Sequence, residues 1–151
     1  MDGFTWSIQK AGYEFSQADE MGTTDYENFI QEFTNFPWLD QIEEAQNNPI
    51  KSAPTLSVKD LKTGKDFWVS MSGNRNDHGY LIGYIYPRER KSLLGLGNKK
   101  IVRWLEIYLT NDTELVKMCF DDFFNRDYNS LESKIGNLEL YDEMVAKDLA
   151  K

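Results

Sequence analysis

The segment 66–110 constrains the fold of this chain more than any other. It contains three runs that are rich in aromatic and β-branched residues, DFWVSMS, YLIGYIYP and KIVRWLEIYLT. The segments between these runs, GNRNDHG and RERKSLLGLGN, are rich in turn-forming and charged residues. Such runs separated by turn signals predict an antiparallel meander. We expect the remaining segments to pack around this meander as helices.

Side chains along the three runs divide between two faces, because successive side chains of a strand point to opposite sides of the sheet. One face is mainly aliphatic and is formed by Phe67, Val69, Met71, Leu81, Ile85, Ile101, Leu105, Ile107 and Leu109. The other face mixes aromatic with polar residues and carries Trp68, Tyr80, Tyr84, Tyr86, Trp104 and Tyr108. We expect the C-terminal helices to cover the aliphatic face. The pattern leaves open whether the aromatic face is core or exposed.

The rest of the chain predicts one further strand on each side of a helical pair. Residues 4–9 alternate like a short strand, 11–22 resemble a loop, and 55–61 begin the sheet. Helices are expected from Thr24 or Asp25, where Thr24 with Glu27 fits a capping box, and from Pro37, because an N-terminal proline also marks a helix start. Two more are expected over 112–126 and 129–149, where apolar residues recur at helical spacing.

The predicted fold is therefore a single α+β domain over residues 1–151. It has an antiparallel sheet of four to five strands with two N-terminal and two C-terminal helices, in the order β-α-α-β-β-β-β-α-α. A chain of 151 residues is long enough to bury a core of its own. No apolar run approaches the ~20 residues of a membrane span, and the N-terminus lacks the pattern of a signal peptide. We expect a cytoplasmic protein with no membrane partner.

Residues with catalytic potential are few and isolated. His78 is the single histidine, which excludes any site that needs two imidazoles, and Cys119 is the single cysteine, which excludes an internal disulfide. Cys119 lies on the apolar side of a predicted helix, where a buried thiol is expected. Adjacent carboxylates such as Asp121 and Asp122 diverge on a helix rather than converging in a cleft. We expect no enzyme activity, no cofactor and no metal, with a site near His78, Arg75 and Asp77 as the alternative.

The net charge of −8 is unevenly distributed along the chain. Residues 1–50 hold ten acids and one base, residues 51–111 five acids and eleven bases, and residues 112–151 ten acids and five bases. Acidic helical segments thus flank a basic sheet segment, and part of this pattern is internal complementarity. An acidic surface for a protein partner is expected from Asp40, Glu43, Glu44, Asp121, Asp122, Glu139, Asp142 and Glu143.

With these acidic residues and no apparent active site, the chain resembles in general make-up the immunity proteins of bacterial toxin systems. These are compact acidic single domains that plug the basic or catalytic cleft of a toxin. The resemblance implies a module that binds another protein, a cognate toxin, and neutralises it by occlusion. Opposite electrostatic fields steer rapid association between such partners.

The alternative partner is a nucleic acid or a phosphate-containing ligand. Aromatic side chains beside basic ones form the stacking platforms of several single-stranded nucleic-acid binders. The basic loop 88–100 and the aromatic strand face supply such a set in Trp68, Tyr84, Tyr86, Arg88, Arg90, Lys91 and Trp104. The overall negative charge opposes this alternative, because it repels a polyanion.

Overall fold

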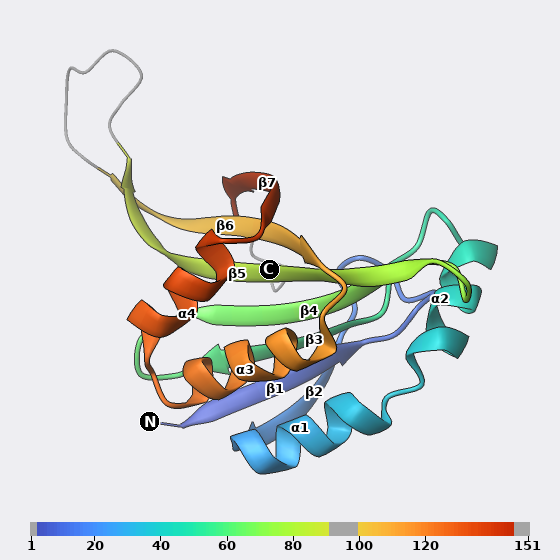
Figure 1. The fold of residues 1–151 in the computed structure, drawn as a ribbon, viewed down its shortest axis with the longest axis horizontal. Coiled ribbons are helices and arrows are strands. Elements are labelled where there is room, and N and C mark those ends of the chain that lie inside the picture. The colour runs from blue at the N-terminus through green and yellow to red at the C-terminus, as the bar shows by residue number, and fades with distance from the viewer. Residues whose placement is uncertain (1–2, 91–99, 147–151) are drawn as a thin grey trace.

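The computed structural model describes residues 3–90 and 100–146, which form one antiparallel sheet with four helices on it (Figure 1). The order of the strands across the sheet is β2-β1-β3-β4-β5-β6-β7. The strands are β1 (Phe4–Gln9), β2 (Asp19–Thr24), β3 (Thr55–Asp60), β4 (Asp66–Gly73), β5 (His78–Arg90), β6 (Lys100–Thr110) and β7 (Glu139–Val145). The helices are α1 (Tyr26–Asn35), α2 (Trp38–Asn47), α3 (Thr113–Phe124) and α4 (Tyr128–Gly136).

The prediction of four to five strands, with the C-terminal helices ending the chain, is wrong because both edge strands were missed. β2 has the sequence DEMGTT, with no buried side chain, and pairs with β1. β7 was expected to be the end of a helix over 129–149. Helix α4 stops at Gly136, and all seven residues of β7 are exposed. A half-buried strand is recognised in a sequence by alternating apolar and polar residues. An edge strand with no buried side chain does not need this alternation, so the sequence gives no such signal.

Three of the helices begin at aspartate side chains that accept a hydrogen bond from a free backbone N–H. Asp25 accepts from Asn28 at 2.9 Å, Asp112 from Leu115 at 3.1 Å and Asp127 from Ser130 at 3.2 Å. Such caps satisfy donors that the first helical turn leaves without partners. The first cap is therefore Asp25 rather than Thr24.

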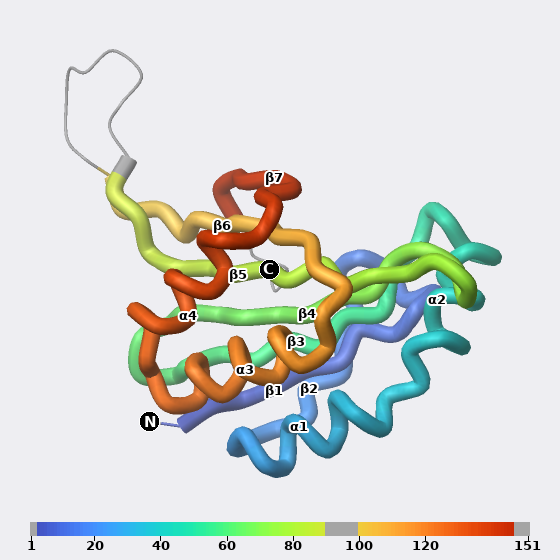
Figure 2. Tube along the Cα trace, viewed as in Figure 1, coloured from blue at the N-terminus to red at the C-terminus, as the bar shows by residue number. Residues whose placement is uncertain are grey.

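All four helices pack on the same face of the sheet (Figure 2). Phe29 and Phe33 of α1 meet Phe120 of α3, with ring centroids 4.6 and 6.4 Å apart. Phe120 lies 4.8 Å from Phe67 of β4, and Trp38 of α2 lies 6.1 Å from Tyr80 of β5. Edge-to-face and tilted rings of this kind add to the free energy gained by burying aromatic surface.

The helices cover the opposite side of β5 and β6 from the one predicted. Phe67 pairs with Tyr84 and Val69 with Ile82, and residues directly opposite in an antiparallel pair share a face. The aromatic side of β5 therefore belongs to the core, where Tyr80, Ile82 and Tyr84 are buried. The helix-free face carries side chains that remain partly exposed, namely Trp68, Leu81, Ile85, Leu105, Ile107 and Leu109.

A buried carboxylate, that of Asp60, ties β3 to the turn between α3 and α4. Asp60 ends β3 with no exposed surface and accepts two hydrogen bonds from the Arg126 guanidinium, each at 3.0 Å. Its other donors are the Tyr128 hydroxyl, the Thr63 hydroxyl at 2.9 Å and the Lys62 amide at 2.9 Å. A buried charge is tolerated when it is paired and its lone pairs are hydrogen-bonded, as they are here.

The surroundings of Asp60 lower its pKa to about 2. Burial alone would raise the pKa, but the hydrogen bonds from Arg126, Tyr128, the Lys62 amide and Thr63 outweigh burial because they favour the charged form. Arg126 itself adopts a positive φ of 55° and lies 4.6 Å over the Phe4 ring. The cluster thus joins three parts of the chain that are far apart in sequence.

Replacing Asp60 with asparagine is expected to lower the free energy of unfolding by about 3 kcal/mol, because the Arg126 charge loses its buried partner. Urea denaturation at neutral pH measures this change. Asp77→Asn, in the exposed β4–β5 turn, is the matched control and should change stability by less than about 0.5 kcal/mol. Equal effects of the two substitutions would contradict the assignment.

The stability that Asp60 contributes is expected to depend on pH. The folded pKa of about 2 lies below the unfolded value of about 3.9, so this contribution is complete above the unfolded pKa and is lost as the pH falls towards 2. The difference in unfolding free energy between the wild type and Asp60→Asn should therefore narrow over this interval. A constant difference between pH values of about 5 and about 2 would rule out the low pKa.

Candidate functional site

The eight acidic residues predicted as one partner surface lie on three separate elements. Asp40, Glu43 and Glu44 belong to α2, Asp121 and Asp122 to α3, and the remaining three to β7. Figure 1 places α2 at one end of the sheet and β7 along one edge, so these residues do not form one continuous patch. Each group therefore has to be judged by its own surroundings.

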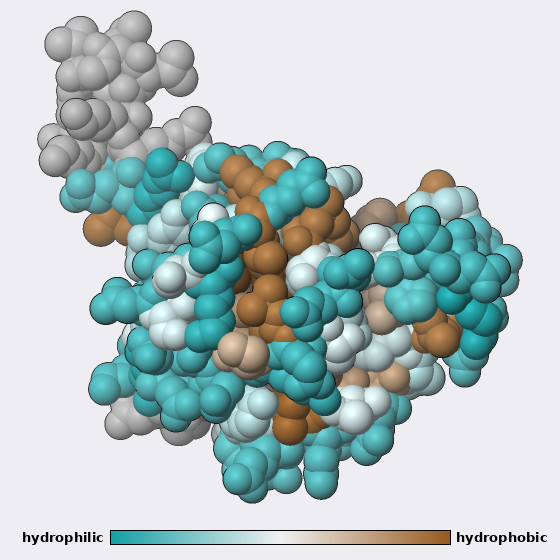
Figure 3. All heavy atoms as spheres, in the orientation of Figure 1, coloured by the Kyte–Doolittle hydropathy of each residue, from teal (hydrophilic) through white to brown (hydrophobic). Residues whose placement is uncertain are grey.

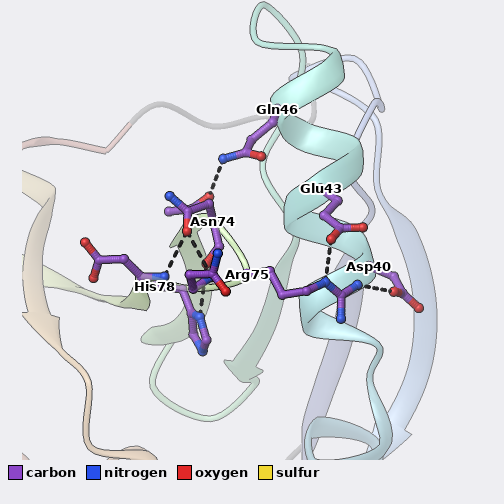
Figure 4. Close-up of polar contacts among 9 residues, drawn as sticks. Asp40, Glu43, Gln46, Asn74, Arg75 and His78 are labelled. Atoms are coloured by element: carbon purple, nitrogen blue, oxygen red, sulfur yellow. Dashed lines mark hydrogen bonds and ion pairs between the residues drawn. The ribbon is translucent and has the colours of Figure 1, made fainter.

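Two of the acids on α2 are paired within the chain (Figure 4). The Arg75 guanidinium, from the β4–β5 turn, lies 2.9 Å from the Asp40 carboxylate and also bonds Glu43. These bonds lower the pKa of Glu43 and raise the pKa of Arg75 above its usual range. Gln46 donates to the Gly73 carbonyl at 3.1 Å. Asp40 and Glu43 thus hold the hairpin against α2.

His78, the alternative catalytic residue, lies at the end of the same turn. Its Nδ1 is 3.1 Å from the backbone carbonyl of Asn74, whose side chain accepts from the amides of Asn76 and Asp77 at 2.9 Å each (Figure 4). These contacts are those of a closed turn. That the chain has no enzyme activity stays a prediction.

A groove of about 430 Å³ lies between α2 and the β4–β5 hairpin. Two polar side chains in its walls have internal partners: the Trp38 indole N–H donates to the Phe33 carbonyl at 3.0 Å, and the Tyr80 hydroxyl lies 3.2 Å from that of Thr113. The lining residues are Phe36, Pro37, Trp38, Leu39, Asp40, Met71, Arg75, His78 and Tyr80. The polar groups of the groove are thus largely occupied by internal contacts.

The two acids of α3 divide between structural and exposed positions. Asp122 accepts from the Lys134 ammonium at 2.6 Å and so links α3 to α4. Asp121 is exposed and accepts from the Asn125 side chain at 3.1 Å. Only Asp121 is well exposed to a partner.

The edge strand β7 is the most exposed of the predicted acidic segments. It carries Glu139, Asp142 and Glu143 together with four exposed apolar side chains, among which Tyr141 is 61% and Leu140 46% exposed. Met144 and Val145 are the other two. Figure 3 shows apolar side chains gathered around the position of β7. Exposed apolar residues grouped in this way are typical of an interaction surface.

The aromatic and basic residues of the alternative set lie on both faces of the sheet. Trp68 is on the helix-free face, where its ring crosses Gly83 so closely that a Cβ there would lie 2.0 Å from the ring. Tyr84, Tyr86 and Trp104 are on the helix-covered face. The predicted set is therefore not one surface.

The predicted acidic and basic sets meet at Glu143. The Trp104 indole N–H donates to Glu143 at 3.2 Å, and the Arg88 guanidinium lies 3.6 Å from the same carboxylate and 4.7 Å over the Trp104 ring. Arg90 ends β5 opposite Lys100, and Lys91 lies outside the described residues.

Three tyrosines and two glutamates form a pocket of about 170 Å³ beside β7, which we call the Tyr–Glu pocket. The Tyr86 and Tyr108 hydroxyls donate to Glu106 at 2.8 and 2.7 Å, and the Tyr84 hydroxyl donates to Glu132 of α4 at 2.8 Å. Ile135 completes the lining. Burial, followed by the bond to Glu106, raises the pKa of Tyr86 to about 12.

The pKa values of Tyr84 and Tyr108 are also raised, first by burial and then by their bonds to glutamate. The phenols therefore stay protonated and act as donors, and the oxygens of Glu106 and Glu132 act as their acceptors. Glu106, Tyr108 and Glu132 were not predicted as site residues. Trp104, Glu106 and Tyr108 alternate on one face of β6, and this alternation could have indicated Glu106 and Tyr108. No sequence signal brings Glu132 of α4 close to them.

Comparisons with protein-family models, with curated protein sequences and with solved structures find no match for this chain. Among the helices of the described segments, none is long and apolar enough to cross a membrane. Within residues 3–90 and 100–146, no three His, Cys, Asp or Glu side chains converge as metal ligands do.

Cys119 is fully buried in α3, as the sequence predicts, and burial, followed by the charge of Asp122, raises its pKa to about 12. We expect iodoacetamide to alkylate this thiol much more slowly in native buffer than in denaturant, because the thiolate is the reactive form. Mass spectrometry over time measures the modification. Alkylation at the same rate in both conditions would show that the thiol is accessible and reactive.

Proposed function

We propose that this chain is a cytoplasmic protein-binding module that neutralises a basic partner protein by occluding it, as the immunity proteins of bacterial toxin systems do. The observation that carries this proposal is β7, an edge strand whose apolar and acidic side chains are all exposed. Apolar side chains supply contact area, and surrounding charges select and steer a partner of opposite sign.

The surroundings of β7 support a basic partner. β7 pairs with β6, so that Leu140 lies opposite Tyr108 and Glu143 opposite Glu106. Glu106 and Tyr108 of the Tyr–Glu pocket therefore adjoin Glu143 and Leu140 of the strand. Together they form one surface, which we call the β7 surface and which consists of the exposed residues of β7 and the Tyr–Glu pocket.

A nucleic-acid partner stays a prediction with less support. The hydroxyls of Tyr84 and Tyr86 donate to carboxylates. The positive charge of Arg88 lies beside the negative charge of Glu143, which partly neutralises it. The same carboxylates would repel a phosphate backbone.

The proposal predicts that charge reversal on β7 separates the chain from its partner. We expect the tagged wild type to recover one protein at one-to-one stoichiometry from a lysate of its source. The variant Glu139→Lys/Asp142→Lys/Glu143→Lys should weaken binding of that protein by on the order of 100-fold, because like charges then face the basic partner. Titration calorimetry with the purified partner measures the affinity.

A control with the same change in net charge is Glu20→Lys/Glu27→Lys/Glu32→Lys, which alters exposed residues on β2 and α1. It should bind the partner with an affinity within about threefold of that of the wild type, because its charges lie away from β7.

Occlusion further requires that one equivalent of the wild type abolish the partner's activity. Equal losses of affinity in both variants, or a bound partner that stays active, would disprove the proposal.

A further inference from the structure

The Tyr–Glu pocket contains two carboxylates for which the described chain provides no cation. The nearby basic groups have other partners, since Lys134 bonds Asp122 at 2.6 Å and Arg88 lies 3.6 Å from Glu143. Among the described side chains of residues 3–89 and 100–146, no ion pair of Lys or Arg with Glu106 or Glu132 is seen. The three phenols compensate these charges only in part, because a hydroxyl carries no net charge.

Both carboxylates retain the capacity to accept further hydrogen bonds. An ionised carboxylate offers about four lone-pair sites. Glu106 uses two of them for Tyr86 and Tyr108, and Glu132 uses one for Tyr84. The tyrosine hydroxyls, in contrast, already donate their protons. A ligand therefore meets acceptors rather than donors, which favours a cation with several N–H groups.

The aromatic wall of the pocket restricts the kind of cation further. The rings of Tyr84 and Tyr86 are stacked, with centroids 5.0 Å apart and planes at 26°. A planar guanidinium stacks on such rings and donates in a fork to carboxylates, whereas an ammonium is a compact, strongly hydrated point charge. A volume of about 170 Å³ accommodates the end of one side chain rather than a whole folded element.

We infer that the Tyr–Glu pocket receives the guanidinium group of an arginine side chain from the partner protein, between the carboxylates of Glu106 and Glu132. This inference rests on the proposed function, because the pocket forms part of the β7 surface. Glu132 is exposed and Tyr86 partly exposed, so the pocket is open to a partner that lies along β7. The arginine would act as the central anchor of the interface, with the acids of β7 around it.

The pocket can be tested without the partner by NMR titration with N-acetyl-arginine amide. We expect saturable shifts of the ring signals of Tyr84, Tyr86 and Tyr108, with a dissociation constant on the order of 1 mM. N-acetyl-citrulline amide has nearly the same shape but no charge, and it should give no saturable shift. Equal binding of the two amides, or no binding of the arginine amide, would overturn the inference.

Glutamine substitutions identify the carboxylates that bind the guanidinium. Glu132→Gln keeps the size of the side chain and an oxygen for the Tyr84 hydroxyl, whereas Glu106→Gln keeps the size but replaces one of the two oxygens that accept from Tyr86 and Tyr108 with an NH2 group. Each substitution should weaken binding of the arginine amide at least tenfold. Glu32→Gln, on α1, is the matched control and should have no effect. Thermal unfolding of each variant confirms that it folds. A folded variant that binds the arginine amide as the wild type does would contradict the assignment.

The same glutamine variants separate this inference from the proposed function. If the captured partner loses affinity at least tenfold on Glu106→Gln/Glu132→Gln, the arginine anchor is supported. If the partner still binds tightly and requires β7, the anchor is wrong but the protein-binding function stands. If the arginine amide binds and no protein is captured, the proposed function fails, and with it the assignment of the guanidinium to a partner.

Discussion

All four helices pack on one face of the sheet, and this packing determines which side chains of each strand belong to the core. Once Phe67 and Val69 of β4 face the helices, antiparallel register places Tyr84 and Ile82 of β5 on the same side. The next register step brings Glu106 of β6 beside Tyr84. The carboxylate of Glu106 therefore lies at the border of an aromatic core, where phenol hydroxyls are its donors.

The same constraint explains which parts of the fold could be predicted from the sequence. Alternation in β4, β5 and β6 separated two faces correctly within each strand, but it does not say which face of one strand adjoins which face of the next. The aliphatic set joined Phe67 to Leu81, although register places them on opposite faces. A local sign of the true arrangement is Gly83, which leaves the space that the Trp68 ring occupies on the helix-free face.

The site was predictable only in part, because the pairing of charges depends on contacts between residues far apart in sequence. Asp40 and Glu43 carry the negative charge expected of the predicted binding surface. Arg75, more than thirty residues away in sequence, nevertheless pairs with both. Asp122 is likewise paired with Lys134. The acids of β7 were correctly listed among exposed residues, although they were placed on a helix. Their position beside Glu106 follows from strand pairing, which helical spacing cannot indicate.

The two clusters of carboxylate and tyrosine differ in a way that bears on function. At Asp60 a tyrosine hydroxyl and a bidentate arginine satisfy the same buried carboxylate, and the result is a depressed pKa and a link between distant segments. At Glu106 two tyrosine hydroxyls are present but the arginine is missing from the described chain. A partner that supplied a guanidinium at Glu106 would complete there the arrangement that Arg126 completes at Asp60, and by binding the folded chain it would also stabilise the fold.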